Sequence, residues 1–570
     1  MNDSKAQSDG GRAWWQRSLL GIFSRHSVRG AGYSFVVLFF ILLVLVPTLF
    51  VLSVLFTGWG DIQSTVFSEP DRMGVVWSAI GYSFGAAFLV TLLDIAFGLP
   101  IAWFLVRREF RGKALINTLI DAPLAVPTAG LGVSVALLWT GVVGSPFLLL
   151  ILLHFTTTYP YMVRSLAAIL AEIDIEYETA GRTFGASKLT AARTITLPLF
   201  RSGLATGAIL CLAKALSETG GVMAALILLA GSSFGEGSGL NGTALIGVWK
   251  DCSKEYIAPQ TPPFYCHGIT DPTLKSALTF VSALLIIFSL ILLAIVKLLA
   301  TRFKFPLKKV WPTFEARLSK GAVPMIRDAA AFAFLIFMVL IPSFFIAGYM
   351  ITGSPTSSVN WGSFWNGVIL TLAIAGIATA IDLLLGIPLA ILIVRGRFRR
   401  LGALLDVLVN VPYIVPSAAL GISLGSFYAA VGVKGFDVFL VTMAHVAFTF
   451  PFVVRNVVGA MEGLDPGYED TARTLGARPF QVFKRIVYPM IKPAVLAGAI
   501  MAFTRSVGET GATLSVSSDV LTAPILIVNY TKYGNRDLYT AGLLIALLTV
   551  VCFIAILAMR IVTSRRQRHA

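Results

Sequence analysis

The chain has 570 residues, of which 56% are apolar and 13% are charged. This composition excludes a soluble enzyme and is typical of a protein that crosses a membrane many times. The net charge of +16 would suit a nucleic-acid-binding protein, but the basic residues lie in alternate loops, which argues against a nucleic-acid partner. Loops 107–113 and 395–400 are basic, whereas loops 58–75 and 353–366 hold one basic residue or none. The pattern predicts that both termini are cytoplasmic and that membrane lipid surrounds the helices.

About twelve apolar segments are long enough to cross a hydrocarbon core, which requires roughly 20 residues. Each is predicted to be helical, because lipid offers no partner for unpaired backbone groups. The first apolar run is too long for a cleaved signal, so we interpret it as a retained helix. The segments centre near 33–57, 79–105, 114–140, 146–168, 201–230, 275–300, 328–352, 367–394, 403–429, 435–455, 494–517 and 537–562.

The second half of the sequence repeats the first. DIAFGLPIAWFLVRREF from Asp94 aligns with DLLLGIPLAILIVRGRF from Asp382, and HFTTTYPYMVR from His154 aligns with HVAFTFPFVVR from His445. Each half therefore holds six helices, and a six-helix unit begins and ends on the same side of the membrane. The sequence predicts an all-α membrane protein with about twelve transmembrane helices in two parallel, pseudo-symmetric halves and a pathway at their interface.

The segment that joins the two halves is basic and carries no long apolar run, so we interpret it as a cytoplasmic linker and not as a separate domain. The expected parts of the chain are a cytoplasmic N-terminal tail at 1–32, a first half at 33–300, the linker at 301–327, a second half at 328–562 and a cytoplasmic tail at 563–570.

A polar segment occurs once in each half. The first copy is YETAGRTFGASKLTAARTITLPLF from Tyr177, and the second is YEDTARTLGARPFQVFKRIVYPMI from Tyr468. A shared spacing of Gly, Ile and Pro is carried by Gly185, Ile195 and Pro198, then by Gly476, Ile486 and Pro489. Gly permits a bend between two short helices, and Pro marks where the next membrane helix begins. Solvated loops rarely keep such a spacing in duplicate, so we interpret the segments as two docking sites, with Arg182 and Arg473 as candidate partners of acids on a soluble protein.

Two acids lie inside apolar segments at equal positions of the repeat. They belong to the runs Ser217-Glu218-Thr219 and Gly508-Glu509-Thr510. An acid within a membrane segment faces the bundle interior or a wet cavity, so these two are candidates for the central pathway. Lys214 and Arg505 precede them by four residues and are candidate ion-pair partners. A gate or a packing brace without substrate contact explains the same residues equally well.

Other motifs indicate no catalytic chemistry. The sequence has no Gly-x4-Gly-Lys-Ser/Thr run, so no ATP site of that type is expected, and no cofactor or metal site is predicted. The Gly-x-Ser-x-Gly run at 231–235 has no strand before it, and we interpret it as a loop. His154 and His445 are interpreted as structural hydrogen-bonding residues. Cys252 and Cys266 share the outer loop 231–274, where a disulfide and two unpaired thiols are equally expected.

The two docking segments resemble the loop signature Glu-Ala-Ala-x3-Gly-x9-Ile-x-Leu-Pro of type I (MetI-like) permeases from binding-protein-dependent ATP-binding-cassette (ABC) importers. The chain departs from the signature at its start, where the acids Glu178 and Glu469 stand one place early. The triplet itself falls on Thr179, Ala180 and Gly181 in the first copy and on Asp470, Thr471 and Ala472 in the second. The resemblance implies that these loops couple to two ATPase subunits that bind the ATP, that an external solute-binding protein delivers the substrate, and that the protein resides in the inner cell membrane.

The resemblance also bears on the substrate. Ser-Glu-x-Gly and Gly-Glu-x-Gly resemble permeases for sulfate, molybdate and tungstate, whereas the fusion of two halves in one chain resembles ferric-iron and thiamine importers. We favour a tetrahedral oxyanion, with ferric iron or thiamine as the alternative. A rival class is the ion-coupled secondary transporter, which also has internal repeats and buried carboxylates but needs no docking loop. A channel or sensor module is a second rival.

Overall fold

The computed structural model describes residues 26–68, 70–143, 145–229, 242, 245–246, 271–302, 311–318, 322–352, 359–396, 398–433, 435–517, 519–531 and 537–567. All regular secondary structure in these ranges is helical, which confirms the predicted fold class. Eight of the helices are long and apolar enough to cross a membrane, or ten if each of two bent helix pairs is one span. The protein is therefore a multi-pass membrane protein. Cys252, Cys266 and the run 231–235 lie outside the described residues.

Within the described residues, the first half contains three helices long enough to span a membrane, one bent pair, two shorter apolar helices and one polar hairpin. Its first segment combines α2 (His26–Phe39), η1 (Phe40–Leu45) and α3 (Val46–Thr57), followed by α4 (Trp59–Ile62) and η2 (Gln63–Phe67). The next helices are α5 (Pro70–Arg107), α6 (Lys113–Ile120), α7 (Ala122–Ala125), α8 (Thr128–Trp139) and α9 (Pro146–Glu172). The polar hairpin is α10 (Ile175–Thr183), α11 (Lys188–Ala191) and η3 (Ala192–Thr196), after which come α12 (Leu197–Ser217), α13 (Gly220–Leu229) and α15 (Asp271–Arg302).

The second half repeats this order after the linker helix α16 (Pro312–Leu318). Its first segment is α17 (Val323–Leu335), η4 (Ile336–Leu340) and α18 (Ile341–Thr352), followed by α19 (Trp361–Arg395), α20 (Arg399–Leu408), α21 (Val411–Ile414), α22 (Ser417–Ala430) and α23 (Asp437–Glu462). The second hairpin is α24 (Gly467–Thr474), α25 (Pro479–Val482) and η5 (Phe483–Val487), and the chain continues with α26 (Tyr488–Val507), α27 (Gly511–Val516), α28 (Ala523–Asn529) and α29 (Leu538–Gln567).

Four of the expected membrane segments, 114–140, 201–230, 403–429 and 494–517, are broken and not single helices. The helix before Pro416 meets the helix after it at 105°, and the break after Ser217 bends the chain by 50°. Proline lacks a backbone donor and disfavours the helical conformation of the residue before it. Accordingly Val126, which precedes Pro127, is extended with ψ 129°. The helix expected at 494–517 also lies earlier in the chain, because α26 ends at Val507.

The first segment of each half packs on the other half, so the halves are interlocked. Helix α3 packs on α22, and α18 packs on α8. The Ser423 hydroxyl donates to the carbonyl oxygen of Pro47 at 2.7 Å and accepts from the N–H of Val51 at 2.9 Å. Its repeat mate Ser134 accepts from the N–H of Ile346 at 2.9 Å. These hydroxyls of one half satisfy backbone groups in the first segment of the other half, which a lipid environment requires.

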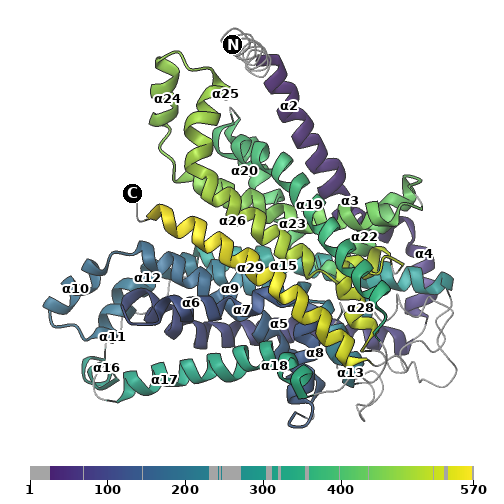
Figure 1. Ribbon diagram of the computed structural model, residues 1–570, viewed down its shortest axis with the longest axis horizontal. Coiled ribbons are helices and arrows are strands. Elements are labelled where there is room, and N and C mark those ends of the chain that lie inside the picture. Colours follow the sequence, from purple (N-terminus) through teal and green to yellow (C-terminus); the bar gives the residue numbers. More distant parts are fainter. Residues whose placement is uncertain are drawn as a thin grey trace, which may run out of the picture.

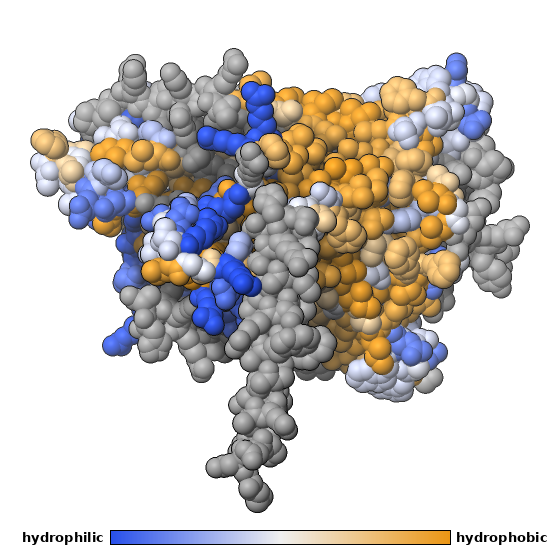
Figure 2. All heavy atoms as spheres, turned by 90° about the horizontal axis from the view of Figure 1, so that it is seen from above, coloured by the Kyte–Doolittle hydropathy of each residue, from blue (hydrophilic) through white to orange (hydrophobic). Residues whose placement is uncertain are grey.

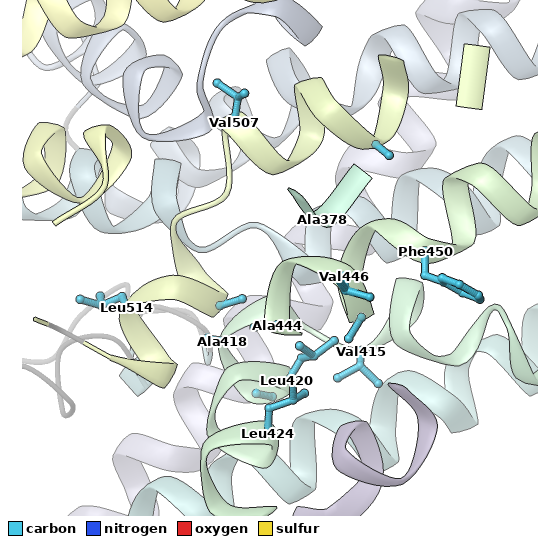
Figure 3. Close-up of a cluster of buried hydrophobic side chains, with 14 of the residues drawn as sticks. Ala378, Val415, Ala418, Leu420, Leu424, Ala444, Val446, Phe450, Val507 and Leu514 are labelled. Atoms are coloured by element: carbon cyan, nitrogen blue, oxygen red, sulfur yellow. The ribbon is translucent and has the colours of Figure 1, made fainter. Parts of the chain in front are cut away.

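The polarity of the surface and the composition of the core are those expected of a protein that spans a membrane. Figure 2 shows a broad apolar band on one face, with hydrophilic side chains gathered toward one end of the molecule. Small and branched residues fill the core of the second half, where Figure 3 shows Val415, Ala418, Leu420, Leu424, Ala444 and Val446 gathered together. The two halves lie apart at the end that carries α10 and α24 and approach each other at the opposite end, near α13, α22 and α28 (Figure 1).

Candidate functional site

The two acid-containing runs meet where the halves touch. The Thr128 hydroxyl of the first half donates to the Gly508 carbonyl of the second at 3.1 Å. In the opposite direction, the Ser417 hydroxyl donates to the Ser217 carbonyl at 2.9 Å. A Cβ atom at Gly220 would lie 2.5 Å from Cβ of Thr510, and so close an approach leaves room only for glycine. We call this closely packed region the central contact.

Close packing at the central contact is symmetric in the repeat. A Cβ atom at Gly511 would lie 2.5 Å from Cβ of Thr219, the mate of the contact between Gly220 and Thr510. Thr219 and Thr510 are both buried. The structure thus brings the two copies of this run together, and it closes the interface between the halves with small and hydroxylated residues.

Both acids bridge a break in their helix. Glu218 forms an ion pair with Lys214, and its other carboxylate oxygen accepts from the N–H of Gly221 at 3.0 Å. Glu509 pairs with Arg505 at 3.1 Å and accepts from the N–H of Ala512 at 2.9 Å. Each carboxylate therefore links a cation on the preceding helix to the N-terminus of the following one, where unpaired N–H groups favour negative charge. The predicted ion pairs are present, and both pairs are buried.

A cavity of about 270 Å³ lies beside the central contact and is lined by both halves. Its cations are Lys214, Arg505 and Arg164, and its acid, Asp121, pairs with Arg164 at 2.7 Å. Arg505 lies over the Phe448 ring, with 4.2 Å from its guanidinium carbon to the ring centre. The buried Nη1 of Arg505 has no hydrogen-bond partner among the described residues. Tyr161 also lines the cavity, together with Thr128, Thr157 and Thr504, whose hydroxyls donate to backbone carbonyls.

The two buried histidines differ in their surroundings, because the Nδ1 of His154 has no hydrogen-bond partner among the described residues, whereas both ring nitrogens of His445 do. His445 contacts the Ser506 hydroxyl at 2.7 Å and the Thr513 hydroxyl at 2.8 Å, on the two sides of the break at Gly508. Since both ring nitrogens are engaged, His445 fixes the two helix ends relative to each other. This agrees with the structural interpretation of His445 from the sequence.

Both polar hairpins contain the predicted glycine bend. Gly185 has φ +89° and Gly476 has φ +83°, the left-handed region that favours glycine. Ile195 packs on Gly181, because a Cβ atom at Gly181 would lie 2.5 Å from the Ile195 Cδ1. The equivalent positions in the second copy are Ile486 and Ala472. The two prolines of the spacing, Pro198 and Pro489, stand in the first turn of α12 and α26.

Glu178 and Glu469 of the hairpins are turned toward the body of the protein. Glu178 pairs with Arg107 at 3.1 Å, and Glu469 pairs with Arg395 at 2.9 Å. The sequence assigned Arg473 to acids on a partner, but the structure pairs it with two acids of its own helix. It contacts Glu469 at 3.0 Å and Asp470 at 2.9 Å.

Apolar residues take the exposed positions of the hairpins instead. Phe184 is 92% exposed, and its repeat mate Leu475 is 83% exposed. Tyr177 and Tyr468 form a second exposed pair. Sequence reasoning missed these four residues, although large apolar side chains at equal positions of a polar loop were a visible signal. The polar and small residues Thr179, Ala180, Arg182 and Thr471 are exposed beside them.

The linker helix packs on the first hairpin. Glu315 of α16 accepts from the Thr190 hydroxyl at 2.6 Å and from Arg193 at 2.5 Å. It also accepts from the N–H of Trp311 at 3.2 Å. The Thr190 hydrogen bond, followed by the bonds from Trp311 and Arg193, lowers the pKa of Glu315 below its ordinary value. The two hairpins are therefore supported differently.

Comparison with known proteins places this architecture in one family. The family described as "binding-protein-dependent transport system inner membrane component" matches residues 94–305 and again residues 382–568. The sulfate transport system permease protein CysT of Salmonella typhimurium is 34% identical over 184 residues, which cover 29% of this chain and 66% of that protein. The molybdenum transport system permease protein ModB of Mycobacterium tuberculosis is 31% identical over 194 residues, which cover 30% of this chain and 73% of that protein.

A probable sulfate transport system permease protein, cysT of Prototheca wickerhamii, is 29% identical over 201 residues, covering 33% of this chain and 78% of that protein. The match to the Salmonella protein thus spans just under two thirds of that relative's length. The family match, by contrast, covers most of the chain in two copies that coincide with the two structural halves. The chain belongs to the family of binding-protein-dependent transport system inner membrane components.

Proposed function

We propose that this chain is the transmembrane permease subunit of an ABC importer that moves a small inorganic oxyanion delivered by an external binding protein. The observation that carries the proposal is the pair of glycine-bent hairpins that project from the same end of two interlocked halves. Their exposed residues Phe184 and Leu475 suit two equal grooves on a dimeric partner. In this proposal two ATPase subunits bind and hydrolyse ATP, and the chain itself is not an enzyme.

The proposal fixes the orientation and the parts of the protein. The end that carries α10 and α24 faces the cytoplasm of a cell with an inner membrane, together with both termini and the linker 301–327. The permease halves are 33–300 and 328–562. Separation of the halves at the α10 and α24 end, with a closed central contact, corresponds to an inward-open state (Figure 1). Closure of the ATPase dimer would draw the hairpins together and open the central contact from the other side.

The cavity supports an oxyanion as the cargo. Two carboxylates would suit a cation such as ferric iron, but Lys214 and Arg505 already pair with Glu218 and Glu509. The unpartnered Nη1 of Arg505 can donate a hydrogen bond to an anion, which needs donors and offers none. The relatives named above are described as sulfate and molybdenum permeases, which agrees with this choice.

Proline at the hairpin glycines tests the docking role. Pro fixes φ near −65°, which is incompatible with the positive φ of Gly185 and Gly476. We expect Gly185→Pro with Gly476→Pro to abolish ATPase co-purification and uptake of labelled sulfate and molybdate while membrane insertion continues. Gly432→Pro is the matched control, because Gly432 has φ +87° but lies in the loop between α22 and α23. Uptake that survives both hairpin changes would refute the docking role.

Two further measurements separate the rival functions. Uptake by the purified chain in liposomes under an ion gradient, without an ATPase, would favour a secondary transporter. Competition of labelled molybdate uptake by sulfate, ferric citrate or thiamine separates the candidate substrates. We expect competition by the oxyanion alone. We also expect Arg505→Met to weaken uptake more than Met substitution of Arg400, which is exposed and lies outside the docking hairpins and the cavity.

A further inference from the structure

Arg107 occupies the last position of α5, where it holds two other parts of the first half. Its Nε donates to Glu178 of α10 at 3.1 Å, and its Nη2 donates to the carbonyl oxygen of Ile173 at 2.9 Å. Ile173 is the residue at which α9 ends. One guanidinium therefore joins the end of a long membrane helix, the end of the next one and the start of the hairpin.

Arg395 makes the same connections in the second half. It is the last residue of α19, and its Nε donates to Glu469 of α24 at 2.9 Å. Its Nη2 donates to the carbonyl oxygen of Leu464, just beyond the end of α23, at 2.7 Å. Glu469 accepts a further bond from Arg473 at 3.0 Å. The geometry has thus been kept in both copies, although the neighbouring sequence differs.

These pairs are shielded from solvent, unlike the rest of the hairpin surface. The Arg107 and Glu178 side chains are 11% and 14% exposed, and those of Arg395 and Glu469 are 21% and 7% exposed. In each pair a partly buried guanidinium donates both to a carboxylate and to a carbonyl oxygen. The planar group fixes the directions of these hydrogen bonds, so the connection is rigid. The family signature would assign this carboxylate to a contact with the ATPase. In the structure it forms an ion pair within the chain instead.

We propose that the pairs Arg107–Glu178 and Arg395–Glu469, which we call the hairpin struts, transmit movement of each hairpin to the long helices α5 and α19. The acids are positioning residues and not partner contacts. This inference rests on the proposed function, because it assigns the route by which a docked ATPase moves the halves.

The long helices are suited to pass the movement on, because each is fastened to its neighbour inside the membrane. Thr158 of α9 donates to Asp94 of α5 at 2.6 Å, and Thr449 of α23 donates to Asp382 of α19 at 2.6 Å. Each half is therefore fastened within the bundle as well as at the hairpin. A pull on the hairpin is delivered to a helix pair that moves as a unit.

The test separates docking from transmission. Glu178→Gln combined with Glu469→Gln keeps the side-chain shape but weakens both struts. We expect ATPase subunits to co-purify with this variant, while labelled molybdate taken up per ATP hydrolysed in proteoliposomes falls about tenfold. Glu109→Gln with Glu462→Gln is the matched control, because these acids are exposed near the same helix ends, and its coupling ratio should stay at the wild-type value.

A charge exchange provides the second variant. Arg107→Glu with Glu178→Arg restores the ion pair with reversed polarity, and we expect it to recover part of the coupling lost in Arg107→Glu alone. The variant with both Gln substitutions could lose ATPase co-purification as completely as the variant with proline at the hairpin glycines. That result would place the acids in the partner interface and refute the proposed role of the struts. An unchanged coupling ratio, or an exchange variant no better than the single one, would overturn them too. If the wild-type chain binds no ATPase, the proposed function itself is refuted.

Discussion

The substitution Gly132→Ala offers a sharp test of the packing that holds the central contact. Gly132 of α8 faces Gly221 of α13, three residues beyond Glu218. A Cβ atom at Gly132 would overlap the carbonyl oxygen of Gly221 and lie 2.6 Å from its carbonyl carbon. Carbon atoms pack at about 3.5–4.0 Å, so the helices would have to separate by about 1 Å. The obstructing atoms belong to the backbone, so no side-chain rotation can relieve the overlap.

The loss of stability expected for Gly132→Ala follows from comparison with a glycine that has space for a Cβ atom. Gly425 of α22 meets no atom within 4 Å in the described part of the chain. Alanine gains about 1 kcal/mol over glycine in a helix at both positions. The difference between Gly132→Ala and Gly425→Ala therefore isolates the overpacking term, which is about 1–3 kcal/mol. We expect Gly425→Ala to be neutral or stabilising and Gly132→Ala to be less stable by that difference.

The assay is reversible unfolding of the purified chain in mixed micelles with increasing SDS, followed by tryptophan fluorescence. Uptake of labelled molybdate in the reconstituted complex is measured in parallel, and we expect a loss in Gly132→Ala only, because α13 begins at the central contact. Equal stability of the two alanine variants would refute the close approach of α8 and α13. It would also remove the packing argument for the central contact.

Three other changes test separate parts of the structure. Glu218→Gln leaves the buried Lys214 without its counter-charge, so we expect a loss of about 3–5 kcal/mol in the same unfolding assay. Phe184→Ser with Leu475→Ser should change stability by less than about 0.5 kcal/mol because both residues are exposed, yet lower ATPase affinity at least about tenfold. The lowered pKa of Glu315 stabilises the linker contact above the ordinary value of 4.5, and this contribution is lost as the pH falls through the lowered pKa. Proteolysis of the linker should therefore increase only below about pH 4.5 in the wild type, and at neutral pH in Glu315→Gln.

Opposite outcomes would be equally informative for these three. A Glu218→Gln variant as stable as the wild type would mean that Lys214 reaches another carboxylate or water. A serine pair that unfolds easily would place Phe184 and Leu475 in the fold and not at a partner surface. Linker cleavage independent of Glu315 would show that α16 is held by other contacts.

The helical class, the twofold repeat and the hairpin glycines could all be predicted from the sequence, because they depend on local properties. Apolar run length, a positive φ that favours glycine, and recurrence of the same letters do not require knowledge of distant neighbours. The breaks at Val126–Pro127 and Val415–Pro416 were also encoded locally, but hydropathy hid them. The hydropathy of an apolar run is the same whether the helix is straight or bent by a proline.

The positions of side chains relative to distant residues were decided by the tertiary structure alone. Glu178 meets a guanidinium 71 positions earlier in the chain, so the acid that appeared free to contact a partner is held within its own half. Likewise the crossing of each first helix onto the opposite half depends on packing between segments that share no sequence pattern. The sequence by itself determined which residues recur and where the chain can bend. Only the folded chain decided which charges face each other, because pairing depends on distance in space and not on spacing in sequence.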